Sequence, residues 1–255
     1  LRRLRQARQQ RLEGLARNAR VDVFDVAGGP AGVALPHALA EAGHERVVAG
    51  LAYDKRGVRV SRVVGSQGVG GSFAVLGADA AAALDALRRH PAIDASRVGL
   101  AGSSQAGWVA AKTVALGFEP AAVFLLGAAG TALDVPEQNL YNTRVRMECA
   151  GIAPAAIQLA LDLQAAFFEF VLDPANSTAK PLDQATEAAR ALPALTDWLF
   201  PSAAETDLDA PAWFTTLELD FDPLPVWAGY DGQATFVFAE HDDSTPTSLT
   251  ASRLR

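Results

Sequence analysis

The chain has 255 residues, of which half are hydrophobic, and a net charge of −7. That length fits one α/β domain with a large core and an insertion. The acidic balance disfavours nucleic acid as a partner. A single cysteine, Cys149, excludes an internal disulfide and favours a reducing, cytoplasmic compartment. No apolar run reaches the length needed to cross a membrane and residues 1–20 do not resemble a signal peptide, so we expect no membrane partner.

Strand and helix signals alternate along the first half of the chain. Residues 1–20 are compatible with a helix or with a disordered basic arm, and charge alone does not decide between them. The Gly-, Ser- and Val-rich residues 61–77 are predicted to be loop. From β-branched runs, apolar periodicity and Gly or Pro stops, we expect strands at 21–26, 46–53, 97–102, 121–130 and 234–240, and helices at 35–42, 78–90 and 106–116.

The order of these elements predicts an α/β fold with a doubly wound, mostly parallel sheet. The pattern changes after residue 130, where helical segments such as 155–172 and 182–192 follow one another and no strand is evident. This change predicts a helical cap insertion over the carboxyl edge of the sheet. The expected organisation is therefore an arm at 1–20, a core at 21–130 and 221–255, and the cap at 131–220.

The strongest chemical signal is the hexapeptide Gly-Ser-Ser-Gln-Ala-Gly at 102–107, between a predicted strand and a predicted helix. Gly102 and Ala106 place small residues two positions before and two after Ser104, which is the pattern of a nucleophile elbow. A turn this tight excludes larger side chains and holds the serine hydroxyl away from the sheet. The helix N-terminus that follows favours developing negative charge. The alternative is an ordinary Gly/Ser loop between a strand and a helix.

Acyl transfer at such a serine also needs two N–H donors for the oxyanion and an acid that orients the base. One donor would be the backbone of Gln105, directly after the serine, and the other that of Gly29, in the loop at 27–32. The acid would be Asp242 or Asp243, just past the strand at 234–240. The alternatives are an ordinary turn at Gly29 and a surface carboxylate after the strand.

Other residues give weaker signals. The glycines at 65–71 match neither the dinucleotide fingerprint nor the phosphate-binding loop. Cys149 belongs to no cluster of metal-ligating residues. Asp54 and Arg56 are expected to buttress a loop through a charge-assisted hydrogen bond. We therefore predict no cofactor and no metal.

Taken together, four segments resemble the α/β-hydrolase superfamily, in particular bacterial serine hydrolases of the esterase and prolyl-oligopeptidase-like type. Residues 78–108 resemble the family's helix, turn, strand and elbow in sequence. Ala-Glu-His-Asp-Asp-Ser-Thr-Pro at 239–246 is similar to the family's Gly-Glu-x-Asp-x-x-Val-Pro, which implies that Asp242 is the triad acid. The other segments are Tyr-Asp-Lys-Arg-Gly-Val-Arg-Val-Ser at 53–61 and Asp-Phe-Asp-Pro-Leu-Pro at 220–225. The resemblance spans about residues 21–250 and implies an α/β-hydrolase fold.

The resemblance also implies a catalytic histidine that follows the acid in chain order. Asp242 is followed by no histidine in these residues. We expect the base to lie beyond Arg255 in a longer protein, and the 255 residues by themselves to be nearly inactive, because a serine hydroxyl needs a base to become a good nucleophile. The histidines present are His37, His44, His90 and His241.

The expected reaction is hydrolysis of a carboxylic ester through an acyl-enzyme on Ser104, with a small-molecule ester or peptide as substrate. The loop at 27–32 resembles the His-Gly-Gly-Pro-Gly loop of proline iminopeptidases, although Ala27 stands where the histidine would be, so a peptidase is one alternative. A non-catalytic relative that binds a small apolar ligand under the cap is another. The sequence leaves the oligomeric state open.

Overall fold

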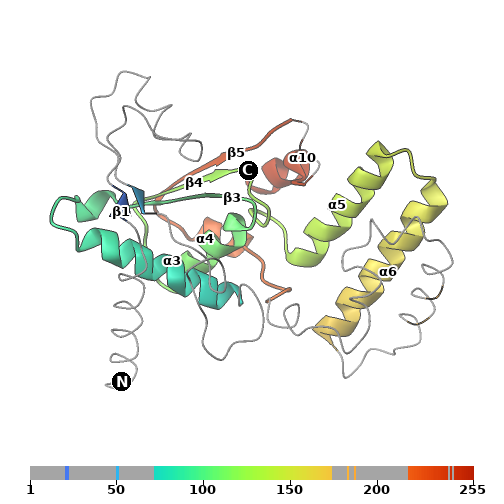
Figure 1. The fold of residues 1–255 in the computed structure, drawn as a ribbon, viewed down its shortest axis with the longest axis horizontal. Helices are drawn as coiled ribbons and strands as arrows, with labels where there is room; N and C mark the ends of the chain where they lie inside the picture. The colour runs from blue at the N-terminus through green and yellow to red at the C-terminus, as the bar shows by residue number, and fades with distance from the viewer. Residues whose placement is uncertain are drawn as a thin grey trace.

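The computed structural model describes residues 21–22, 50–51, 72–173, 218–240, 242 and 244–255, with Asp183 and Glu187 as single helical positions. Figure 1 shows these parts of the chain in colour. The predicted arm at 1–20, the helix at 35–42, the site residue Gly29 and nearly all of the helix at 182–192 lie outside the described residues.

Three parallel strands form the larger sheet. They are β3 (Leu100–Ser103), β4 (Ala122–Leu126) and β5 (Gln233–Val237), and they lie side by side in that order (Figure 1). Each of the three predicted segments contains a strand and the parallel direction is confirmed, but the strands are shorter than predicted: residues 127–130 form the loop after β4 and residues 238–240 lie beyond the end of β5. Parallel neighbours need a crossover between them, which explains the helices found between β3 and β4 and between β4 and β5. The fold is therefore mixed α/β.

Two Ala-rich helices pack against each other on one side of this sheet. They are α3 (Phe73–Arg88) and α4 (Ala106–Ala115) (Figure 1). Their backbones approach closely, since a Cβ added at Gly77 would lie 3.1 Å from the Thr113 backbone nitrogen. The short helix α9 (Leu224–Ala228) also contacts α4. Small side chains thus allow a tightly packed helical layer behind the strands.

Helix α3 begins at Phe73, so the prediction of a loop is wrong for residues 73–77. The Ser72 side chain caps the helix by accepting the Val75 N–H at 3.3 Å. Glu218 Oε2 accepts a second unpaired N–H of the first turn, that of Ala74, at 2.7 Å. Glycine and valine content suggested a loop here, but a serine cap and a distant glutamate start the helix earlier.

The first two strands differ from the expected arrangement. β1 (Val21–Asp22) and β2 (Gly50–Leu51) pair with each other in antiparallel direction, in a sheet separate from β3–β5. The prediction that the early strands join one parallel sheet is therefore not met for these residues. Hydrophobic patterning identifies a strand but carries no information about the direction of its neighbour.

Between β4 and β5 the described residues form a pair of packed helices, α5 (Val135–Cys149) and α6 (Pro154–Leu172). Asp134 caps α5 by accepting the Glu137 N–H at 2.8 Å, and Pro154 occupies the first turn of α6. Met147, Leu163 and Phe168 fill the core cluster to which both helices contribute. Figure 1 shows the pair lying beyond the carboxyl ends of the strands. The helical character predicted for this segment is present, while its role as a cap stays a prediction.

Helix α6 corrects one expectation from the sequence. It has 19 residues and a mean hydropathy of 1.5, so by length and composition it could cross a membrane. Polar residues interrupt the apolar residues of this helix, so it contains no continuous apolar run of that length. Seven of its residues are buried inside the protein, Phe167 and Phe168 among them.

Candidate functional site

Ser104 occupies a strained turn at the carboxyl end of β3. Its φ angle is 52°, in the left-handed region where a non-glycine residue costs about 1–2 kcal/mol. Ser104 is the one non-glycine residue with positive φ in the described part of the chain. Gln105 returns to a helical conformation and α4 starts directly after it. The predicted strand, turn and helix are therefore present, and Ser104 is exposed at their corner.

The turn admits only small side chains on either side of the serine. A Cβ added at Gly102 would lie 2.5 Å from the Ala106 Cβ, which is closer than two carbon atoms can pack. A Cβ at Gly107 would clash with the Ala129 carbonyl oxygen in the loop after β4. The spacing of small residues seen in the sequence thus has a steric cause in the folded turn.

The neighbouring strand ends in a similar way. Gly127 follows β4 with a φ angle of 51°, almost the same as that of Ser104. The Ser104 N–H donates to the Gly127 carbonyl oxygen at 3.3 Å, and the Gly127 N–H donates to the carbonyl oxygen of Val237, the last residue of β5, at 2.8 Å. These hydrogen bonds hold the ends of all three strands together. Gly127 was predicted to lie inside a strand at 121–130, so its place at this edge was missed.

Asp242 reaches the same edge from the loop after β5. A Cβ added at Gly127 would lie 3.5 Å from Asp242 Oδ2, so this oxygen faces the residue that is bonded to Ser104. The other oxygen, Oδ1, accepts the N–H groups of Ser244 and Thr245 at 2.8 and 2.9 Å. The carboxylate is half-buried and its orientation is held by backbone donors. Because β3, β4 and β5 run parallel, their carboxyl ends bring together residues 104, 127 and 242.

Helix α4 is anchored behind the turn by Trp108. The buried indole stacks on Phe73 with ring centroids 5.3 Å apart, and its Nε1–H donates to the Leu133 carbonyl oxygen at 2.8 Å. A side chain at Gly130 would collide with the same indole ring. The tryptophan therefore fixes the first turn of α4 against both α3 and the loop after β4.

The other predicted site residues are only partly placed. Gln105 lies directly after the serine, at the N-terminus of α4, where one oxyanion donor was predicted. Gly29, Asp243 and the histidines at 37, 44 and 241 lie outside the described residues. His90 is described; it accepts the Ala92 N–H at Nδ1 in the loop between α3 and β3. This loop precedes the amino end of β3, so His90 is at the opposite end of the strand from Ser104.

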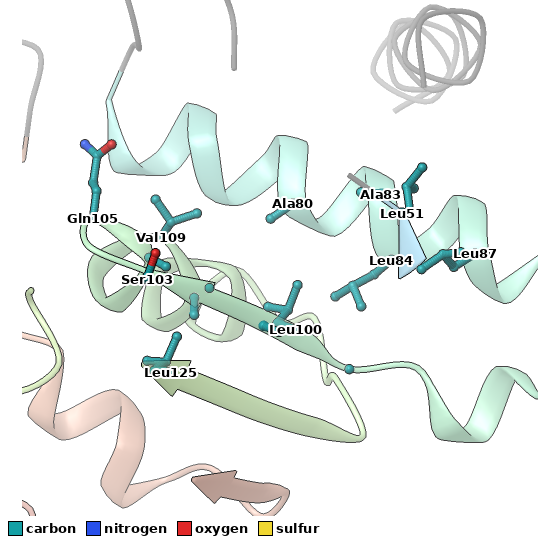
Figure 2. Close-up of a pocket in the computed structure, with 15 residues that line it drawn as sticks. Leu51, Ala80, Ala83, Leu84, Leu87, Leu100, Ser103, Gln105, Val109 and Leu125 are labelled. Atoms are coloured by element: carbon teal, nitrogen blue, oxygen red, sulfur yellow. The ribbon is translucent and has the colours of Figure 1, made fainter. Parts of the chain in front are cut away.

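A pocket of about 270 Å³ lies between α3, β3 and α4. Its walls are mostly aliphatic. Figure 2 shows that it runs along β3, from Ser103 and Gln105 at one end to Leu87 at the other. Ser104 itself is not among the lining residues, while both of its neighbours in sequence are. The labelled apolar residues along its length are Leu51, Ala80, Ala83, Leu84, Leu100, Val109 and Leu125.

Charged groups gather at the start of α5, close in space to the loop that carries Asp242. Arg253 in α10 (Thr247–Arg253) binds both carboxylate oxygens of Glu137, at 2.7 and 2.8 Å. This hydrogen-bonded pair lowers the pKa of Glu137. Burial raises the pKa of Asp134, and the hydrogen bond from the Glu137 N–H offsets only part of this effect. The pair ties the last helix to the first turn of α5.

A scan against protein-family models, a search of curated proteins and a search of solved structures find no match for this chain. The arrangement of Ser104, Gly127 and Asp242 at one sheet edge therefore has to carry the functional argument by itself. In the described part of the chain no group of three or more His, Cys, Asp or Glu residues is placed to hold a metal ion.

Proposed function

We propose that this chain is a serine hydrolase of the α/β-hydrolase type, which cleaves a carboxylic ester through an acyl-enzyme on Ser104. The observation that carries the proposal is the left-handed φ of Ser104 at a strand-to-helix corner. A serine there costs conformational energy that glycine would avoid, and strain of this kind concentrates at functional sites. Gly102 and Ala106 allow this tight corner to form, because their small size avoids a clash between them.

The proposed chemistry follows from the position of each group. Ser104 Oγ attacks the ester carbonyl carbon, and its proton passes to a histidine base. The base then gives that proton to the departing alcohol, which leaves an acyl ester on Ser104. Water, deprotonated by the same base, releases the acid and restores the serine. The N–H groups of Gln105 and Gly29 would stabilise the oxyanion in both halves of the reaction.

Asp242 has the role of orienting the base. Its Oδ1 is already held by two backbone N–H donors, while Oδ2 faces the loop beside Ser104. A carboxylate fixed in this way can accept the N–H of an imidazole and set its tautomer. The order along the chain, serine on one strand and acid two strands later in the same sheet, supports this assignment.

The nucleophile is tested with a fluorophosphonate probe and with p-nitrophenyl acetate. We expect the probe to modify Ser104, as read by mass spectrometry of the labelled peptide, and ester hydrolysis to depend on the same residue. Ser103→Ala is the matched control, because Ser103 is also exposed and lies one residue away. Labelling or hydrolysis that survives Ser104→Ala, or that is lost equally in Ser103→Ala, would refute the proposal.

The base is sought with histidine variants. The resemblance places it after Asp242, and residues 243–255 contain no histidine, so we expect slow hydrolysis that rises when imidazole is added. His37→Ala, His44→Ala and His241→Ala test whether one of these residues supplies the base, with His90→Ala as the control. A rate that imidazole and all four substitutions leave unchanged would contradict a histidine-assisted mechanism.

Substrate class is tested by comparing a short acyl ester with a prolyl p-nitroanilide. We expect the ester to be the better substrate. A preference for the prolyl amide would favour the peptidase alternative, with Ser104 still the nucleophile. A protein that binds apolar ligands but is never labelled at Ser104, with or without imidazole, would instead be a non-catalytic relative.

A further inference from the structure

The loop that carries Asp242 is attached to helix α5 through a buried amide. The side chain of Gln138 is only 2% exposed, and its Nε2 donates to the Ser244 carbonyl oxygen. One helical turn further on, the Asn142 amide reaches the same carbonyl oxygen at 2.6 Å in the orientation that satisfies its neighbours. Gln138 and Ser244 are 106 positions apart in the chain. This contact therefore joins helix α5 to the loop that follows β5.

The contact acts on the peptide group that holds the acid. The carbonyl of Ser244 and the N–H of Thr245 belong to one planar peptide unit, so fixing the oxygen also fixes the direction of the N–H. That N–H donates to Asp242 Oδ1 at 2.9 Å. A side chain on α5 therefore sets the orientation of a hydrogen bond to the carboxylate, although it does not touch Asp242.

We propose that Gln138 is a positioning residue for Asp242, acting through the peptide between Ser244 and Thr245. The inference rests on the proposed function, because it assigns a use to the orientation of the acid. Burial strengthens the case: a donor that is withdrawn from water is costly to leave unpaired, so the amide stays on its partner. The Thr245 side is equally enclosed, since that residue is 1% exposed.

A second contact holds the same two segments together from the neighbouring position. Arg253 binds the Glu137 carboxylate and also donates to the Ala132 carbonyl oxygen at 3.2 Å. This contact is partly exposed and lies after the acid loop, so it keeps α10 against α5 without orienting the carboxylate. Gln138, and not Arg253, contacts the peptide whose N–H donates to Asp242.

The test uses the whole chain and the variant Gln138→Met, which keeps the length of the side chain and removes its donor. The matched control is Asn139→Ala, because Asn139 Nδ2 donates to Val135 within the same helix and not to the acid loop. The first readout is amide hydrogen exchange at Ser244 and Thr245. We expect exchange there to be faster by about tenfold to 100-fold in Gln138→Met and unchanged in Asn139→Ala.

The second readout is the hydrolysis of p-nitrophenyl acetate with imidazole added as the base, where we expect kcat to fall by about tenfold to 100-fold with KM unchanged, because the acid that orients the base is misplaced while substrate contacts remain. Should Gln138→Met fail to fold, Gln138→Glu replaces the donor by an acceptor of equal size and is expected to change both readouts in the same direction.

Unchanged exchange at Ser244 and Thr245 would overturn the inference. Faster exchange with unchanged, Ser104-dependent hydrolysis would overturn the positioning role as well. If the wild-type chain shows no Ser104-dependent hydrolysis, the proposed function fails, whereas the exchange measurement still tests the contact on its own.

Discussion

Two adjacent strands of this sheet end in turns of nearly the same backbone conformation but different chemistry. The residue after β4 is Gly127, with a φ angle of 51°, and the residue that follows β3 is Ser104, with a φ angle of 52°. Glycine adopts this conformation freely, whereas serine adopts it at a cost. The two residues are hydrogen-bonded to each other, so the comparison is made within one local environment.

The difference shows that backbone geometry alone does not require a serine at position 104. The turn after β4 adopts the same left-handed conformation at a glycine, where it causes no strain. Because glycine would fit this turn without strain, the serine at position 104 supports the proposed catalytic role. The two turns together form one edge at which a strained serine and a relaxed glycine lie beside an oriented carboxylate.

The difference between the two turns is tested most directly by removing the Ser104 hydroxyl. We expect Ser104→Ala to abolish the imidazole-stimulated part of ester hydrolysis, because the acyl-enzyme can no longer form. Gly127→Ala, in contrast, keeps the nucleophile and should retain hydrolysis. Initial rates of p-nitrophenyl acetate hydrolysis measure both variants. Equal losses of hydrolysis in the two variants would show that any change at this edge impairs activity. That result would contradict a specific catalytic role of the Ser104 hydroxyl.

A double-mutant cycle tests the steric origin of the corner. Gly102→Ala places a Cβ 2.5 Å from that of Ala106, and we expect it to lower the free energy of unfolding by about 1–3 kcal/mol. The loss should be much smaller in an Ala106→Gly background, because the opposing methyl is gone. Urea denaturation of the four proteins gives the coupling energy. Additive effects would contradict a direct contact between positions 102 and 106.

The conformational strain at Ser104 is measured by comparing glycine and alanine at positions 104 and 127. Ser104→Gly should be more stable than Ser104→Ala by about 1 kcal/mol, since glycine relieves the left-handed conformation. Gly127→Ala should be less stable than the wild type by a similar amount; the nearest atom to its new Cβ, Asp242 Oδ2 at 3.5 Å, leaves room for a methyl. Thermal unfolding checks both differences. If Ala and Gly are equivalent at position 104, the turn carries no strain.

The smallest expected effect concerns the ion pair that ties α10 to α5. Arg253 lowers the pKa of Glu137 from its ordinary value of 4.5, so this carboxylate stabilises the fold above that pH and the contribution is lost as the pH falls through the lowered value. Both side chains are partly exposed, so Glu137→Gln should cost no more than about 1 kcal/mol at pH 7. Asp134, whose pKa is raised, opposes the trend because its ionisation is unfavourable in the fold.

Urea denaturation between pH 3 and pH 7 separates these contributions. The wild type should lose its advantage over Glu137→Gln as the solution is acidified. A difference between the two proteins that is independent of pH would show that the Glu137–Arg253 pair contributes through packing and not through charge.

The strands β3 to β5, helices α4 and α6, and the small-serine-small corner were predictable from local patterns. The start of α3 was not, since it depends on Glu218, which lies 144 positions away in the chain. The direction of β1 and β2 and the identity of Gly127 were missed for a related reason. Each depends on which distant segment becomes a neighbour, and periodicity in one segment does not contain that information.

The amino-acid sequence by itself determined where a hydroxyl, a carboxylate and the small residues around them stand along the chain, because these follow from residue type and spacing. Only the tertiary structure decided that the end of β4 joins residues 104 and 242 at one edge, and that Gln138 of α5 reaches the peptide that holds the acid. Parallel strand order and helix docking create those proximities between segments that are far apart in sequence, through hydrogen bonds that no local pattern records.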